Sequence, residues 1–274
     1  MITVQLTNGF GNNIFQYVAA RLLAEHHGQE LSVLPPSPDY YAIPDLEQIG
    51  IDFTHKSSPT DLLVTDQYYL QAYSSIYKNQ NMRLRGYFED YKYYYPHLDK
   101  IKTWFSPIIP RDDNALVLHI RTGDRLFMKN EFYTKPRVEK YLSAIGRFNF
   151  SDLYIVTDMP VWKKTTASEL SQIRFHREAP TADRVPIAES VQYINSLIEG
   201  LDQFNPIINN GTVGQDFNFI RTFSNIMFEH GTLSWWAAFL SDADKVGVYG
   251  PWRPWKNKKK NLSQIPLDGW FKWE

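Results

Sequence analysis

The pattern of apolar positions at the start of the chain predicts a strand, a helix and a second strand. Residues 2–6, Ile-Thr-Val-Gln-Leu, alternate apolar and polar side chains over the length of a strand, and residues 31–34, Leu-Ser-Val-Leu, form a second such segment. Between them, apolar side chains recur at helical spacing as far as Gly28, a residue type that commonly ends helices. These side chains are Ile14, Phe15, Val18, Leu22 and Leu23. A turn-rich loop at residues 7–13 joins the first strand to this helix.

A second alternation of apolar runs and helical spacings follows from residue 116 onward. The expected strands are residues 116–120, 153–156, 173–175 and 246–249. The expected helices are residues 135–145, 187–201, 216–228 and 233–240. Strands that alternate with helices imply parallel sheets. The sequence therefore predicts an α/β fold with two Rossmann-like domains, residues 1–108 and 109–274, that face a cleft.

Composition narrows the class of protein and of partner. The chain has 274 residues and a formal net charge of −1, so its overall field does not favour nucleic acid. Cysteine is absent, which excludes disulfides and thiolate metal sites. The amino end shows no signal-peptide pattern, and no apolar stretch approaches the roughly 20 residues that span a bilayer. We therefore expect a cytoplasmic protein.

The loop Asn-Gly-Phe-Gly-Asn-Asn at residues 8–13 is the first candidate for chemistry. It follows a strand and opens a helix, an arrangement in which backbone N–H groups and the helix dipole bind anions. It lacks the third glycine of the dinucleotide fingerprint and the Gly-Lys-Ser/Thr of a P-loop. Two interpretations stay open: the loop from Gly9 through Phe10 and Gly11 approaches an anionic ligand, or Asn12 or Asn13 caps the helix.

The apolar run that ends in Arg121-Thr-Gly-Asp124 is the second candidate. Ligands of open α/β sheets lie at the carboxyl ends of strands. The planar fork of an arginine can bond phosphate oxygens in pairs. Strand alternation points His119 to the same face as Arg121. The alternative interpretation is a surface loop with an ordinary ion pair between Arg121 and Asp124.

Two further segments place polar residues at the end of a strand or the start of a helix. Asp158 follows a predicted strand, and it can accept hydrogen bonds from a ribose or a base, or cap the segment after it. Thr232 or Ser234 can serve as the N-cap of the helix after it, leaving hydroxyl and N–H groups pointed at an anion. The Trp-Trp pair that follows is interpreted as core.

Two other sequence patterns could indicate function but have simpler explanations. Asp242-Ala-Asp244 resembles the Asp-x-Asp of metal-dependent glycosyltransferases, but it stands at the amino end of a predicted strand, so we expect no metal site there. The basic run at residues 256–260 either touches an anionic membrane surface, together with nearby tryptophans, or is a solvated tail. These tryptophans are Trp252, Trp255, Trp270 and Trp273.

Five ordered segments resemble motifs of the α-1,2-fucosyltransferase family, which acts in bacterial polysaccharide and animal blood-group synthesis. The similarity spans nearly the whole chain. The segments are Gly9-Phe-Gly-Asn-Asn-Ile-Phe-Gln-Tyr17, Gly86-Tyr-Phe-Glu89, His119-Ile-Arg-Thr-Gly-Asp124, Val156-Thr-Asp-Met159 and His230-Gly-Thr-Leu-Ser-Trp-Trp-Ala-Ala238.

The resemblance implies a GT-B fold and the inverting, metal-independent transfer of L-fucose from GDP-fucose. It favours a galactose 2-hydroxyl of an oligosaccharide or polysaccharide as acceptor. By the family pattern, Arg121 contacts the donor diphosphate and His119 helps to hold the same loop. Thr232, Leu233 and Ser234 lie against the phosphates, and Asp158 lies near the donor. The loop Gly9–Asn13 approaches the diphosphate or the fucose from the other domain, which is expected to take the acceptor side.

Departures from the family pattern leave the exact donor open. Thr122 stands where the family has a second arginine, and Met159 stands where it has a second aspartate. The candidates for a general base that deprotonates the acceptor hydroxyl are Asp124, Glu89 and Asp90. Glu89 and Asp90 are expected on the acceptor side. The alternatives are a GT-B transferase for another nucleotide deoxysugar and a non-catalytic glycan-binding relative.

Overall fold

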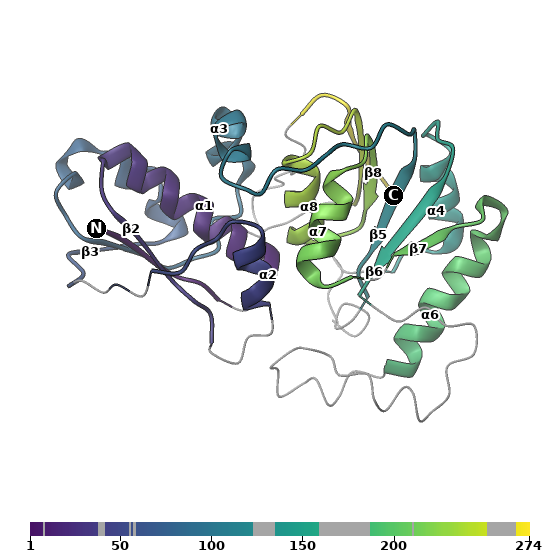
Figure 1. Ribbon diagram of the computed structural model, residues 1–274, viewed down its shortest axis with the longest axis horizontal. Coiled ribbons are helices and arrows are strands. Elements are labelled where there is room, and N and C mark those ends of the chain that lie inside the picture. Colours follow the sequence, from purple (N-terminus) through teal and green to yellow (C-terminus); the bar gives the residue numbers. More distant parts are fainter. Residues whose placement is uncertain are drawn as a thin grey trace. The chain divides into compact units, whose positions relative to one another are not determined.

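The computed structural model describes residues 1–7, 9–37, 42–54, 56, 59–122, 135–158, 187–209, 211–250 and 267–274 (Figure 1). The chain divides into two compact units, Met1–Pro107 and Ile108–Glu274. Each unit holds one parallel sheet with helices, so the chain is α/β and compatible with Rossmann-like folds. The predicted strand at residues 173–175 lies outside the described residues.

The first unit is built on a four-stranded parallel sheet in the order β2-β1-β4-β3. Its strands are β1 (Ile2–Gln5), β2 (Leu31–Leu34), β3 (Leu62–Val64) and β4 (Met82–Leu84). Its helices are α1 (Phe10–His27), α2 (Ile43–Gln48) and α3 (Leu98–Lys102). The predicted opening, a strand, a helix and a second strand, is confirmed.

Helix α1 begins four residues earlier than the apolar spacing predicts. Gly9 is its N-cap, and Phe10 to Asn13 form its first turn rather than a loop. The φ angle of Gly9 is 115°, a value that side-chain-bearing residues rarely adopt, so the chain can turn sharply there. The predicted stop at Gly28 is confirmed, because Gly28 takes the left-handed conformation and its N–H bonds back to the last turn.

The tyrosine-rich stretch contributes to the core of the first unit through short 3₁₀ turns. Tyr69 and Tyr94 are fully buried. The Tyr69 hydroxyl donates to the Ala19 carbonyl oxygen of α1 at 2.9 Å, and its ring packs against Phe88 with 5.2 Å between ring centres. These turns are η1 (Asp66–Tyr68), η2 (Gln71–Tyr73), η3 (Ser75–Tyr77), η4 (Tyr91–Tyr93) and η5 (Tyr95–His97).

The second unit is built on a six-stranded parallel sheet in the order β10-β9-β8-β5-β6-β7. Its strands are β5 (Leu116–Ile120), β6 (Leu153–Thr157), β7 (Ile207–Asn209), β8 (Asn225–Phe228), β9 (Lys245–Tyr249) and β10 (Trp270–Trp273). Its helices are α4 (Val138–Ile145), α6 (Ile187–Gly200), α7 (Val213–Arg221) and α8 (Thr232–Phe239), with a 3₁₀ turn at Asp202–Phe204.

The single helix predicted at residues 216–228 is wrong. The structure has helix α7, a short turn, and then strand β8 in the middle of the sheet. All four residues of β8 are buried, because the strand pairs with β5 on one side and β9 on the other. A strand buried on both faces has no alternation of polar positions, so its apolar run merged with the preceding helical pattern.

Helices cover both faces of the second sheet (Figure 1). Leu118 and Ile120 of β5 belong to a core that includes Tyr141 of α4 and Ile194 of α6. His119, between them in sequence, bonds to Ser234 of α8 and therefore points to the opposite face. The two faces of β5 therefore differ: apolar side chains face α4 and α6, and the polar His119 faces α8.

Two of the tryptophans considered for membrane contact are structural. Trp270 is 8% exposed and Trp273 is 3% exposed, because both stand on β10 with one ring on each face of the sheet. This part of the membrane prediction is wrong, while Trp252, Trp255 and residues 256–260 lie outside the described residues. Among the described helices, none has the length and apolarity that crossing a bilayer requires.

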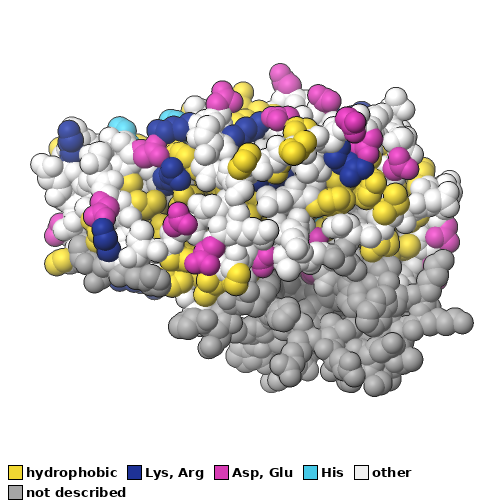
Figure 2. Space-filling model, viewed as in Figure 1, with side chains coloured by type: hydrophobic (Ala, Val, Ile, Leu, Met, Phe, Trp, Pro, Cys, Tyr) yellow, Lys and Arg dark blue, Asp and Glu magenta, His cyan; other side chains and the backbone are white. Residues whose placement is uncertain are grey.

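Basic and acidic side chains are intermixed on the face shown in Figure 2. This distribution agrees with the small formal net charge of −1. An anionic ligand would therefore be attracted by local groups rather than by the field of the whole chain.

Candidate functional site

The carboxyl edge of the second sheet brings three of the predicted segments together. Strands β8, β5 and β6 are adjacent, and His119 pairs in register with Phe228 on one side and Val156 on the other. The residues that follow these strands therefore meet at one edge. Arg121 and Thr122 follow β5, and Asp158 follows β6. This edge is where open α/β sheets bind ligands.

His119 and Ser234 form a buried pair at this edge. His119 is 7% exposed, and its Nδ1 is hydrogen-bonded to the Oγ of Ser234. Burial, with a smaller contribution from the positive charge of Arg121, lowers the pKa of His119 to about 3. The imidazole is therefore neutral near pH 7. When the Ser234 hydroxyl donates to Nδ1, the proton of the neutral ring is on Nε2, which becomes a hydrogen-bond donor.

Thr122 and Asp158 tie the ends of β5 and β6 together. The backbone N–H of Thr122 donates to Oδ1 of Asp158 at 2.9 Å, and the Thr122 hydroxyl donates to the same oxygen at 3.0 Å. Thr122 is fully buried, whereas Asp158 is exposed. Thr122 therefore orients a carboxylate and adds no positive charge at this edge. The segment that Asp158 was predicted to cap lies outside the described residues.

Arg121 is half-buried at the end of β5, close enough for its charge to act on His119. Asp124, the predicted partner of Arg121 and a candidate base, lies outside the described residues. Arg121 and His119 thus place one permanent cation and one neutral imidazole side by side. A cation and N–H donors suit the oxygens of a phosphate group.

The N-terminus of α8 faces the same edge, but its cap differs from the prediction. Gly231 is the N-cap, and neither Thr232 nor Ser234 caps the helix in the described structure. Ser234 bonds to His119 instead, and Leu233 is buried, so these positions supply backbone N–H groups of the first turn. The Trp-Trp pair is core as predicted: Trp235 and Trp236 are fully buried.

Sequence reasoning missed a carboxylate at this edge, Glu229. It follows β8 directly, and the hydroxyl of the fully buried Tyr141 donates to its Oε1. The pattern of residues 216–228 predicts one helix, so the sequence alone does not place Glu229 at the end of a strand. The apolar run Ile226-Met-Phe228 after Thr222 could have signalled a strand and hence a strand-end carboxylate.

In the first unit, the predicted anion loop is the first turn of α1. Phe10 and Gly11 are buried, and Asn12 is half-buried. Asn13 is fully buried, and neither amide atom of its side chain has a hydrogen-bond partner in the described structure. Neither Asn12 nor Asn13 acts as the N-cap predicted by the second interpretation, because that position is Gly9. A buried amide without partners is costly, which singles out Asn13.

The end of β4 lies beside the start of α1. The side chain of Gln16 accepts from the N–H of Thr7 at 3.0 Å and donates to the carbonyl oxygen of Gly86 at 2.9 Å. Asp66 then accepts from the N–H of Phe88 at 2.6 Å. The Gly-rich turn and the segment Gly86–Glu89 are thus held next to each other within the first unit.

The two acceptor-side candidates have different surroundings. Asp90 is the N-cap of η4, and its Oδ1 accepts from the Lys92 N–H at 3.1 Å. Glu89 is half-buried directly after Phe88, a residue with a positive φ of 55°. Asp90 therefore has a structural role as an N-cap, and both carboxylates stay candidates for chemistry on this unit.

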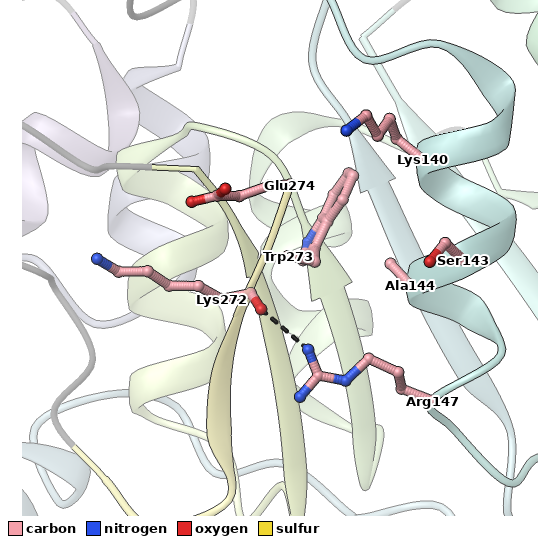
Figure 3. A pocket seen from close by; sticks show the side chains of 7 residues that line it. All are labelled: Lys140, Ser143, Ala144, Arg147, Lys272, Trp273 and Glu274. Carbon is pink, nitrogen blue, oxygen red and sulfur yellow. Dashed lines mark hydrogen bonds between the residues drawn. The ribbon is translucent and has the colours of Figure 1, made fainter.

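A cavity of about 300 Å³ lies elsewhere in the second unit, between α4 and β10 (Figure 3). It is lined by Lys140, Arg147, Lys272 and Trp273, among others, and by none of the predicted site residues. The guanidinium of Arg147 stacks on Phe271 and donates to the Lys272 carbonyl oxygen at 3.0 Å. Because β10 is an edge strand, its Lys272 has a structural explanation: charge on an edge discourages pairing with other chains.

Neither a protein-family model nor a curated protein sequence matches this chain.

Proposed function

We propose that this chain is an inverting, metal-independent glycosyltransferase that moves L-fucose from GDP-fucose to a glycan hydroxyl. The observation that carries the proposal is the carboxyl edge of the second unit. There Arg121, the neutral His119 bound to Ser234, and the N-terminus of α8 converge. Together they offer one cation and several N–H donors, the groups that a nucleotide diphosphate requires.

In the proposed reaction, the bond between C1 of fucose and the diphosphate oxygen breaks as the acceptor oxygen bonds to the opposite face of C1. Negative charge grows on the departing diphosphate. Arg121 and the first-turn N–H groups of α8 stabilise this charge without a metal ion. The acceptor proton passes to a carboxylate, for which Asp124, Glu89 and Asp90 are the candidates. The favoured acceptor is the 2-hydroxyl of a galactose, giving an α-1,2 linkage.

The proposal includes a GT-B arrangement, with the first unit on the acceptor side. The sharp turn at Gly9 and the start of α1 then approach the diphosphate or the sugar. The buried amide of Asn13 supports this role, because a ligand or a bound water is what such an unpaired group requires.

The test is a donor panel with the purified protein, galactoside acceptors and excess chelator. We expect turnover with GDP-fucose, an α-1,2-linked product, and no effect of the chelator. Turnover only with another GDP-deoxysugar would correct the donor. Binding of glycans without binding of GDP would instead identify a non-catalytic relative and overturn the proposal.

A further inference from the structure

We propose that Glu229 is a sugar-recognising carboxylate of the donor site, which accepts a hydrogen bond from a hydroxyl of the transferred sugar. The inference rests on the proposed function, because it assumes that a nucleotide sugar lies along the carboxyl edge of the second unit. It adds an orientation: the diphosphate lies toward α8, and the sugar lies toward α4.

The position of Glu229 follows from strand register. Phe228 is paired with His119, so Glu229 stands at the level of the end of β5, next to the residues proposed to bind the diphosphate. Its partner Tyr141 belongs to the core on the α4–α6 face, whereas the partner of His119 is on α8. The carboxylate and the phosphate-binding groups therefore approach the same edge from opposite faces of the sheet.

The carboxylate of Glu229 is held in place. Tyr141, which donates to it, is fully buried, and its ring packs on Trp273 with 5.1 Å between centres. The hydroxyl of Tyr193 lies 3.4 Å from that of Tyr141 and donates to the Pro136 carbonyl oxygen at 3.0 Å. A carboxylate fixed in this way loses little freedom on binding, which favours recognition of a defined hydroxyl.

The charges along this edge indicate where the diphosphate and the sugar of a nucleotide-sugar donor would each bind. A diphosphate is attracted by Arg121 and repelled by a carboxylate, so it is expected away from Glu229. Sugar hydroxyls are donors that a carboxylate accepts, and the sugar becomes positively charged as its bond to the diphosphate breaks. The half-buried rings of His230 and Tyr249, 5.3 Å apart, lie beside this position and provide apolar surface for a sugar.

The test uses Glu229→Gln in the full chain, with calorimetry for GDP and steady-state kinetics for GDP-fucose. The amide oxygen of glutamine can still accept from Tyr141, so the local fold is retained. We expect GDP affinity within about twofold of the native protein. We expect kcat/KM for GDP-fucose to fall about 10- to 100-fold, as for the loss of a charged hydrogen bond. Glu139→Gln, at an exposed position on α4, is the matched control and should change neither.

Three results would decide against the inference. Native kcat/KM in Glu229→Gln removes Glu229 from sugar recognition. An equal loss of GDP affinity and of kcat/KM indicates that Glu229 supports the edge as a whole. A native protein that neither binds GDP nor turns over GDP-fucose contradicts the proposed function itself, and this is seen before any variant is made.

Discussion

Burial determines what His119, which is hydrogen-bonded to Ser234, can offer to a ligand. An exposed histidine changes its charge near pH 6.5, so its attraction for phosphate varies with pH. Burial removes this variation in His119, whose pKa is lowered to about 3. The positive charge that acts on this imidazole is that of Arg121.

The low pKa of His119 predicts a pH dependence of stability. Between about pH 6.5 and pH 3 the unfolded chain binds a proton on this imidazole that the native protein does not bind. The free energy of unfolding therefore falls as the pH falls through this window, by at most about 1.4 kcal/mol per pH unit. In His119→Gln the slope from urea unfolding should be shallower. His97→Gln, at an exposed position, should follow the native protein; equal slopes in all three would refute the assignment.

Substitution of Arg121, at the end of β5, should affect turnover far more than the stability of the fold. Arg121→Ala is expected to lower kcat/KM about 10²- to 10³-fold, because a charge on the departing diphosphate loses its strongest donor. The far-ultraviolet circular dichroism and the melting transition should stay near native, since Arg121 is half-buried at a strand end. Arg137→Ala, an exposed arginine before α4, is the control. Near-native turnover in Arg121→Ala would remove Arg121 from the mechanism.

At the scale of elements, the sequence predicts the helices and strands whose apolar residues recur at a regular spacing or end at a clear turn residue. Helix α1 and strands β1, β2, β5, β6 and β9 were recognised in this way. Strand β8 was missed because burial on both faces removed the alternation that marks a strand. The contact between His119 and Ser234, 115 residues apart in the chain, required the strand order itself, which no local pattern contains.

The strength of the hydrogen bond between Thr122, after β5, and Asp158, after β6, can be measured by a double-mutant cycle. Thr122→Val removes the hydroxyl that donates to Asp158, and Asp158→Ala removes the acceptor. We expect a coupling free energy of about 0.5–1.5 kcal/mol in urea unfolding, the usual range for a hydrogen bond. The same cycle with Asp152→Ala, an exposed aspartate before β6, should show no coupling to Thr122. A coupling near zero for Asp158 would mean that this contact does not hold the strand ends together.

At the scale of the whole molecule, the chain separates into two units joined near Pro107. The groups proposed for the diphosphate, apart from the turn at Gly9, all belong to the second unit. Tryptophans are unequally divided as well: Trp104 lies in the first unit, and the others lie between residues 162 and 273. Tryptophan fluorescence therefore reports mainly on the unit that is expected to bind the nucleotide.

This division predicts how GDP should stabilise the protein. A ligand at about 100 times its dissociation constant stabilises the native state by about 2.7 kcal/mol. Because most proposed contacts lie in the second unit, GDP should raise the fluorescence-monitored transition more than the transition followed by circular dichroism, which reports on both units. Arg121→Ala should reduce this shift, and UDP at the same concentration should give a smaller one. Equal shifts by both probes would indicate one cooperative unit, and no shift with GDP would contradict nucleotide binding at this edge.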